Sequence, residues 1–305
     1  MTKIPVGKTI ARAYGFAFRD FLRLLGVMWL PMTVMWLPGI FMQQRLAMLQ
    51  TGHGNLLNAW PLIPVYVLIF LFVFMQVIGI AKLALGIEAG PAWIYFSLGK
   101  PVWRLIGTVI LLAVAVIVGW LAVLLGGVLL GFLVALLTKA VNNGLFTGVM
   151  AVIAVVAMIA LWCAYVYVLV RLTFLLVPVI AAEEEGFALA RTWELGYRNF
   201  WRMFVILLAI FGPFLILEMV FIFGSMFHGL PFPPAHATAA QTAAFQAAIN
   251  ARSVEMVGAI YRNWYLTFPI FVLVSVVFYG AGIGAQCFAW RALTEGEASV
   301  PVAAD

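Results

Sequence analysis

Arginine recurs beside aromatic residues at three places where a polar stretch of the chain leads into a long apolar segment. Arg23, Arg104 and Arg202 hold the same place in three related stretches, and Arg198 lies one helical turn before the last of them. A guanidinium group binds phosphate oxygens through paired hydrogen bonds. We therefore predict a lipid-headgroup or anion site at Arg23, Arg104, Arg198 and Arg202. Anchoring to anionic lipid and setting of topology would explain the same residues.

Three polar side chains lie inside apolar segments of the sequence. An ionisable group within a membrane segment marks a functional site unless a nearby charge pairs with it. Glu218 is the strongest such candidate, and Arg262 or His228 could pair with it. Gln76 and Gln286 are expected to form hydrogen bonds between helices, each contributing about 1 kcal/mol. We predict Glu218, Gln76 and Gln286 as intramembrane polar sites.

Residue types that carry out catalysis or bind metals are scattered along the chain. The three histidines have no carboxylate at metal-ligand spacing, and aspartate occurs only at Asp20 and Asp305, so no Ser-His-Asp set is suggested. No glycine-rich phosphate loop precedes a helix in a polar segment. We predict a protein that is not an enzyme and has no catalytic residues, metal or cofactor. The histidines are His53, His228 and His236.

The composition is that of a membrane protein along the whole chain. Of its 305 residues, 66% are hydrophobic and only 9% are charged, against about a quarter charged in soluble domains. The apolar runs are continuous rather than alternating, which favours helices over a barrel. The net charge of +6 is explained by an excess of cytoplasmic lysine and arginine, so we predict no nucleic-acid partner.

The related stretches form an internal repeat. Residues 7–24 and 186–203 share Gly, Ala, Arg, an aromatic residue, Arg, Phe and Arg at matching places, and 88–105 is a weaker copy. We call residues 7–24 motif copy one, residues 88–105 motif copy two and residues 186–203 motif copy three. In copies one and three, apolar residues recur at spacings of four, four and three, which predicts an amphipathic helix lying in the membrane interface. These residues are Ile10, Tyr14, Phe18 and Phe21, and Leu189, Trp193, Tyr197 and Phe200.

Long apolar runs predict six membrane spans. The third and fourth runs are each about 36 residues, or about 54 Å of helix against a hydrocarbon core of about 30 Å. We expect them to form a tilted, partly protruding hairpin with its tip at 138–144. The six spans are roughly 21–41, with Pro31 and Pro38 interrupting it, then 60–83, 102–137, 145–180, 200–227 and 264–290.

The basic residues fix the predicted orientation. Thirteen of the seventeen fall on one side of the six-span arrangement, so both termini and all three motif copies should be cytoplasmic. We predict an all-α membrane protein, with six transmembrane helices arranged as three helical-hairpin repeats. Each repeat begins with a cytoplasmic interfacial amphipathic helix. The whole chain, 1–305, is then a single integral membrane domain, with repeat units at about 7–84, 88–182 and 186–293.

The stretch 171–204 carries a family resemblance. It resembles a broad bacterial group of six-span inner-membrane proteins, similar to the membrane domain fused to some glycerophosphodiester phosphodiesterases. The resemblance implies a fold and a location in the bacterial inner membrane. It implies no catalysis, because the soluble phosphodiesterase barrel has no counterpart in this chain. The matching residues are Arg171, Pro178, Glu184, Trp193, Asn199, Phe200, Trp201 and Arg202.

These features together predict a non-enzymatic multi-pass membrane protein that organises lipid or a membrane partner. The expected partners are the anionic headgroups of membrane lipids and a membrane protein. The alternative is a transporter or channel for a small or lipid-like substrate, since transporters are often built from internal repeats. A polar cavity lined by Gln76, Glu218 or Gln286 would favour the alternative. A lipid-sized groove between repeats would favour the first hypothesis.

Overall fold

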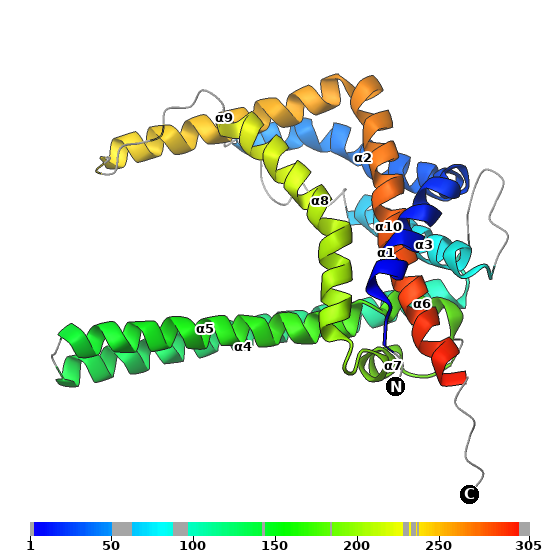
Figure 1. Ribbon diagram of the computed structural model, residues 1–305. Helices are drawn as coiled ribbons and strands as arrows, with labels where there is room; N and C mark the ends of the chain where they lie inside the picture. Colours follow the sequence, from blue (N-terminus) through cyan, green and yellow to red (C-terminus); the bar gives the residue numbers. More distant parts are fainter. Residues whose placement is uncertain are drawn as a thin grey trace, which may run out of the picture. The chain divides into compact units, whose positions relative to one another are not determined.

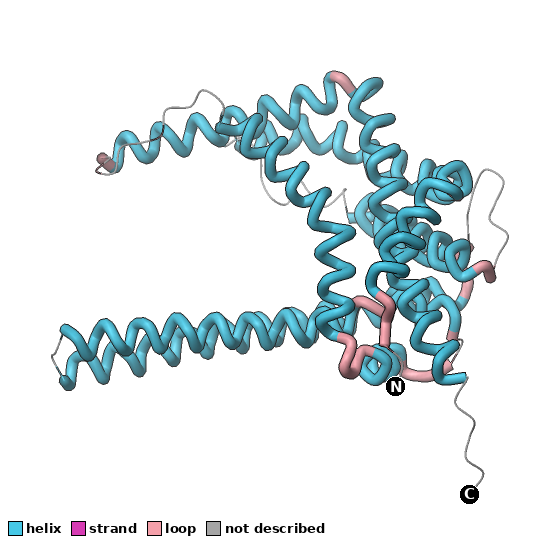
Figure 2. Tube along the Cα trace, viewed as in Figure 1, coloured by secondary structure: helices cyan, strands magenta, loops and turns pink. Residues whose placement is uncertain are grey.

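The computed structural model shows a helical protein (Figure 1), and all regular structure in its described part is α-helix (Figure 2). The chain forms two compact units that interleave along the sequence, and their boundaries differ from those of the predicted repeats. The first unit comprises Met1–Pro5, Leu98–Phe204 and Ala289–Asp305, and the second comprises Val6–Ser97 and Val205–Phe288. The structure describes residues 3–50, 63–87, 97–141, 144–183, 185–227, 232, 236 and 238–298.

The first unit is built around a helical hairpin. Helices α4 (Lys100–Val141) and α5 (Gly144–Thr173) pack side by side (Figure 1), and the chain reverses within the predicted tip region. At 1.5 Å per residue the 42 residues of α4 extend about 63 Å, twice the thickness of a hydrocarbon core. The predicted hairpin is therefore confirmed. Its tilt and protrusion stay predictions.

Glycines of α4 allow α5 to approach closely. A Cβ atom on Gly119 would lie 2.9 Å from Cε2 of Tyr165, and one on Gly127 would lie 2.5 Å from Cε of Met158. The Tyr165 hydroxyl donates a hydrogen bond of 3.2 Å to the carbonyl oxygen of Val116 on α4. The hairpin is thus held by small residues facing large ones, as is typical of membrane helices.

The fourth apolar run is two helices rather than one. α5 ends at Thr173, and a short helix α6 (Leu176–Ala182) follows after a turn. Pro178 accounts for the break, because it has no backbone N–H and its ring would clash with the carbonyl group of Phe174 in a continuous helix. Helix α7 (Ala188–Leu195) then leads into α8, which begins at Phe200.

The second unit contains α1 (Val6–Arg19), α2 (Phe21–Gln50) and α3 (Ile63–Leu85). It also contains most of α8 (Phe200–Phe227), α9 (Ala239–Arg262) and most of α10 (Trp264–Ala298). The prediction that prolines interrupt the first span is wrong. α2 is one helix through both of them, a backbone that membrane helices tolerate when neighbouring groups satisfy the freed carbonyl oxygens.

Glycines of α10 form the close packing expected from their spacing. A Cβ atom on Gly280 would lie 2.7 Å from Cδ1 of Leu24, and one on Gly284 would lie 2.9 Å from Cδ1 of Phe16. Both contacts are with the first motif copy or the helix it leads into. The small-xxx-small spacing of Gly280 and Gly284 therefore serves close helix packing here.

Five helices are long and apolar enough to cross a membrane. They support a membrane protein, as the composition predicts. The side chains of α2 are described only as far as Trp36, and Phe21–Trp36 is an apolar helix too short to be counted with the five. The sixth span and the repeat organisation therefore stay predictions. The five candidate spans are Ile63–Leu85, Lys100–Val141, Gly144–Ala182, Phe200–Ser225 and Trp264–Glu295, where Gly144–Ala182 takes α5 and α6 together.

Candidate functional site at the motif junctions

Motif copies one and three bury the same positions along their helices. The predicted apolar faces are only partly packed, since Leu189 is buried but Phe18 is 64% exposed and Tyr197 is 47% exposed. Small residues on the neighbouring face let the helix approach the protein, which leaves much of the aromatic face outside. The buried positions are Thr9, Ala13, Phe16 and Ala17 in copy one, and Ala188, Thr192, Leu195 and Gly196 at the matching places in copy three.

Arg202 and Asn199 of copy three bind the backbone of one residue. The Asn199 side-chain oxygen accepts a hydrogen bond from the Ile4 N–H at 3.3 Å, and Arg202 Nη1 donates one to the Ile4 carbonyl oxygen at 2.7 Å. Ile4 is completely buried and non-helical. Both polar groups of this residue are thus satisfied by side chains, as a buried backbone requires. We call Asn199 and Arg202 the Ile4 clamp.

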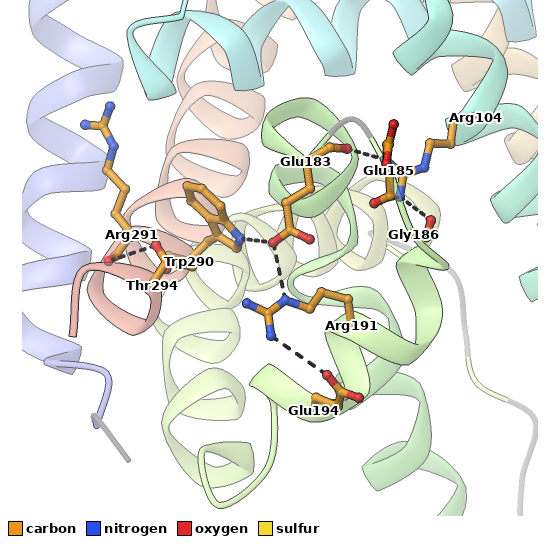
Figure 3. Close-up of polar contacts among 9 residues, drawn as sticks. All are labelled: Arg104, Glu183, Glu185, Gly186, Arg191, Glu194, Trp290, Arg291 and Thr294. Atoms are coloured by element: carbon orange, nitrogen blue, oxygen red, sulfur yellow. Dashed lines mark hydrogen bonds and ion pairs between the residues drawn. The ribbon is translucent and has the colours of Figure 1, made fainter. Parts of the chain in front are cut away.

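Arg104 of copy two also binds backbone rather than leaving its charge free. Its guanidinium group donates hydrogen bonds to the carbonyl oxygens of Glu183, Glu185 and Gly186 (Figure 3). These carbonyl groups follow the C-terminus of α6, where a cation is favourable because the last helical carbonyl groups lack partners. Arg104 therefore holds the turn that leads into copy three.

A small polar network fixes the same turn from another side (Figure 3). The Glu183 carboxylate accepts hydrogen bonds of 3.4 Å from Arg191 Nε and from the indole N–H of Trp290. Arg191 also lies 3.8 Å from the carboxylate of Glu194. The residues come from three elements of the first unit: the turn after α6, helix α7 and the end of α10. The network is thus a structural junction within this unit.

Arg171 is a buried cation surrounded by aromatic rings. Arg171 is only 3% exposed, and its Cζ atom lies 3.6 Å from the centroid of the Trp193 ring. Nη2 donates a 2.6 Å hydrogen bond to the Trp193 carbonyl oxygen, and Nη1 donates one of 3.0 Å to the Tyr167 hydroxyl. No carboxylate of a described residue pairs with it. Arg171 therefore joins the end of α5 to α7.

Arg23 of copy one has a different partner. Its Nη1 atom lies 3.1 Å from the Asp20 carboxylate, and its side chain is 68% exposed. Arg23, Arg104 and Arg202 thus each bind a different protein group. The partners of these three arginines are therefore groups of the protein itself.

A second set of basic residues is exposed at matching places in all three copies. Each is followed three residues later by a large apolar side chain that is 57–78% exposed. None of the three basic residues forms a hydrogen bond or ion pair with a described residue. Only Arg198 is among the sites predicted from the sequence, although the shared place of all three residues in the repeat was a visible signal. The pairs are Arg19 with Leu22, Lys100 with Trp103, and Arg198 with Trp201.

Arg198 also carries backbone strain. Its φ of 62° lies in the left-handed region, which costs a non-glycine residue about 1 kcal/mol or more. The turn places its guanidinium group 5.4 Å from the centroid of the Tyr197 ring, on the exposed side of the junction. Strain at an exposed basic residue is expected where the side chain is held for binding.

The three predicted intramembrane sites differ in their exposure. Glu218 is exposed on α8, and no described residue pairs with it. The side-chain oxygen atoms of Gln76 and Gln286 are buried and accept no hydrogen bond from a described residue. A hollow of about 290 Å³ lies between α4 and α5 and is almost wholly apolar.

Among the residues that the structure describes, no cluster of histidine, cysteine or acidic side chains could hold a metal ion. No protein-family model, curated protein sequence or solved structure matches this chain.

Proposed function

We propose that this chain is a non-enzymatic multi-pass protein of the bacterial inner membrane that organises anionic phospholipid at its motif junctions. The observation that carries the proposal is the exposed basic and apolar pair found at the same place in each copy. The basic groups suit the headgroup level, and the Trp103 and Trp201 rings suit the boundary between headgroups and acyl chains. Six spans in three repeats, with both termini cytoplasmic, would put all three pairs in one leaflet.

The proposed lipid contact lies at a different place in the motif from most of the residues predicted from the sequence. Arg198 remains from the four candidates named by sequence, and Arg19 and Lys100 join it at matching places. Arg104 and Arg202 are assigned to holding the protein backbone, since their guanidinium groups already bind carbonyl oxygens. The apolar hollow between α4 and α5 supports the proposal, because its lining suits an acyl chain.

The transporter alternative requires polar groups that line one cavity. Gln76, Glu218 and Gln286 line neither the hollow between α4 and α5 nor the hollow beside Asp20. Glu218 faces outward from α8 among exposed apolar side chains.

The first test is the lipid that copurifies with the chain. Arg198→Asn removes the charge and keeps a residue that tolerates a left-handed backbone. We expect the variant to fold as the natural chain does and to retain about fivefold less phosphatidylglycerol, since one basic residue near an anionic surface contributes about 1 kcal/mol. Equal retention by Arg198→Asn would contradict the proposal for this residue.

A further inference from the structure

The first motif copy holds a pair of side chains like the Ile4 clamp of copy three. Asp20 and Arg23 stand where Asn199 and Arg202 stand in the motif. The outgoing helix also begins with the same backbone hydrogen bond in both copies. The N–H of Leu24 donates to the Asp20 carbonyl oxygen at 2.9 Å, and the N–H of Met203 donates to that of Asn199 at 3.0 Å.

In copy one the two side chains are turned onto each other. Arg23 Nη1 lies 3.1 Å from the Asp20 carboxylate, with Arg23 largely exposed. An exposed ion pair of this kind contributes about 0–1 kcal/mol, so a ligand can replace it at little cost. Beside the pair is a hollow of about 600 Å³, whose described lining is residues 18–23. That volume lies within the range of ligand pockets, about 300–1,000 Å³.

We propose that Asp20 and Arg23 bind a non-helical segment of a partner polypeptide. Asp20 accepts the N–H of one partner residue and Arg23 donates to its carbonyl oxygen, as Asn199 and Arg202 do with Ile4. The partner residue has an aliphatic side chain, since Ile4 is wholly buried in its clamp. The proposed site consists of the Asp20 and Arg23 side chains and the hollow beside them.

The chemistry of the pair favours a peptide over a phosphate. A phosphate group offers only acceptor oxygens, which suit Arg23 but are repelled by the Asp20 carboxylate. A peptide offers one donor and one acceptor on each residue, which match Asp20 and Arg23 in turn. A carboxylate accepts an N–H bond about twice as strongly as a neutral amide does. Asp20, at the place that Asn199 holds in copy three, therefore keeps a hydrogen-bond acceptor and makes it stronger.

The chain's own segment at the corresponding place does not offer such a residue. Leu85 stands three residues before copy two, as Ile4 stands three residues before copy one. Leu85 is buried and still belongs to helix α3. The next two N–H groups are already used, since Gly86 donates to the Leu83 carbonyl oxygen and Ile87 to that of Lys82. We therefore assign the occupant to another polypeptide rather than to residues 85–87.

The test uses a labelled peptide with the sequence of residues 2–6, TKIPV, blocked at both ends. Its binding to the full chain is measured in nanodiscs of zwitterionic lipid. We expect saturable binding that falls about tenfold or more in Asp20→Ala and in Arg23→Ala. Asp20→Asn restores the chemistry of the Ile4 clamp and should bind within about threefold of the natural chain. Methylation of the isoleucine nitrogen of the peptide should abolish binding, because it removes the donated N–H.

Three results would overturn the proposal. The first is no saturable binding up to about 1 mM peptide, the weakest affinity that such contacts would give. The second is equal binding of the N-methylated peptide. The third is loss of binding in Asn199→Ala with none in Asp20→Ala, which would place the peptide in the Ile4 clamp. The zwitterionic lipid keeps this test independent of the lipid function proposed above. Circular dichroism of each variant verifies that it folds.

Discussion

The guanidinium group of Arg171 stacks on the ring of Trp193 at 3.6 Å and also donates a 2.6 Å hydrogen bond to the carbonyl oxygen of the same residue. One side chain thus holds both the backbone and the ring of α7 against the end of α5. A buried cation without a described carboxylate partner is stabilised here by a π face and by neutral oxygen atoms.

Arg171→Lys should destabilise the fold despite keeping the charge. An ammonium group cannot both stack flat on Trp193 and reach its carbonyl oxygen with a fixed fork of donors. We expect a loss of about 1–3 kcal/mol in the free energy of unfolding, the usual cost of a buried group left without its partner. Thermal unfolding in detergent, followed by tryptophan fluorescence, measures this. An unchanged midpoint in Arg171→Lys would show that charge alone suffices.

The Ile4 clamp predicts a local effect of Asn199→Ala and Arg202→Ala. Either change leaves a buried polar group of Ile4 without a partner, at a cost of about 1–3 kcal/mol. Hydrogen exchange at the Ile4 amide should become at least tenfold faster in Asn199→Ala. Asn199→Asp, which keeps an acceptor oxygen, is the matched control and should retain most of the protection. Equal exchange in both variants would remove Asn199 from the clamp.

The helical hairpin predicts different outcomes for two glycines of α4. In Gly119→Ala the new methyl group would meet the Tyr165 ring, which its hydroxyl contact with Val116 holds in place, so we expect a loss of about 1–3 kcal/mol. Gly131 has nothing within 4 Å of an added Cβ atom, and Gly131→Ala should stabilise the helix by about 0.5–1 kcal/mol. Thermal midpoints of the two variants should therefore move in opposite directions. A shift of the same sign would contradict this packing.

Arg104 predicts that the turn before α7 depends on one side chain. Arg104→Gln removes the charge and most donors to three carbonyl oxygens, while Arg104→Lys keeps one flexible donor. We expect limited proteolysis at 183–186 to be fastest in Arg104→Gln, intermediate in Arg104→Lys and slowest in the natural chain. Cleavage at equal rates in all three would show that Glu183 and its own partners hold the turn without Arg104.

Hydropathy and run length predicted the helices and the hairpin, because burial of backbone in lipid allows few alternatives. The break at Phe174 could have been found from Pro178, four residues later. The partners of Arg104 and Arg202 could not, since carbonyl oxygens have no sequence signature and Ile4 lies far along the chain from its clamp. The packed face of α1 was missed because it is made mostly of small residues, Thr9, Ala13 and Ala17, with Phe16 as its one aromatic member.

The central claim is that the exposed basic residues, and not the arginines that bind backbone, hold anionic lipid. The most direct measurement is native mass spectrometry of phosphatidylglycerol bound to the chain with Arg19→Gln, Lys100→Gln and Arg198→Asn combined. At about 1 kcal/mol for each residue, we expect affinity to fall about 100-fold, with helical content unchanged and little remaining dependence on salt. Lipid binding equal to that of the natural chain, at the same salt concentration, would contradict the account.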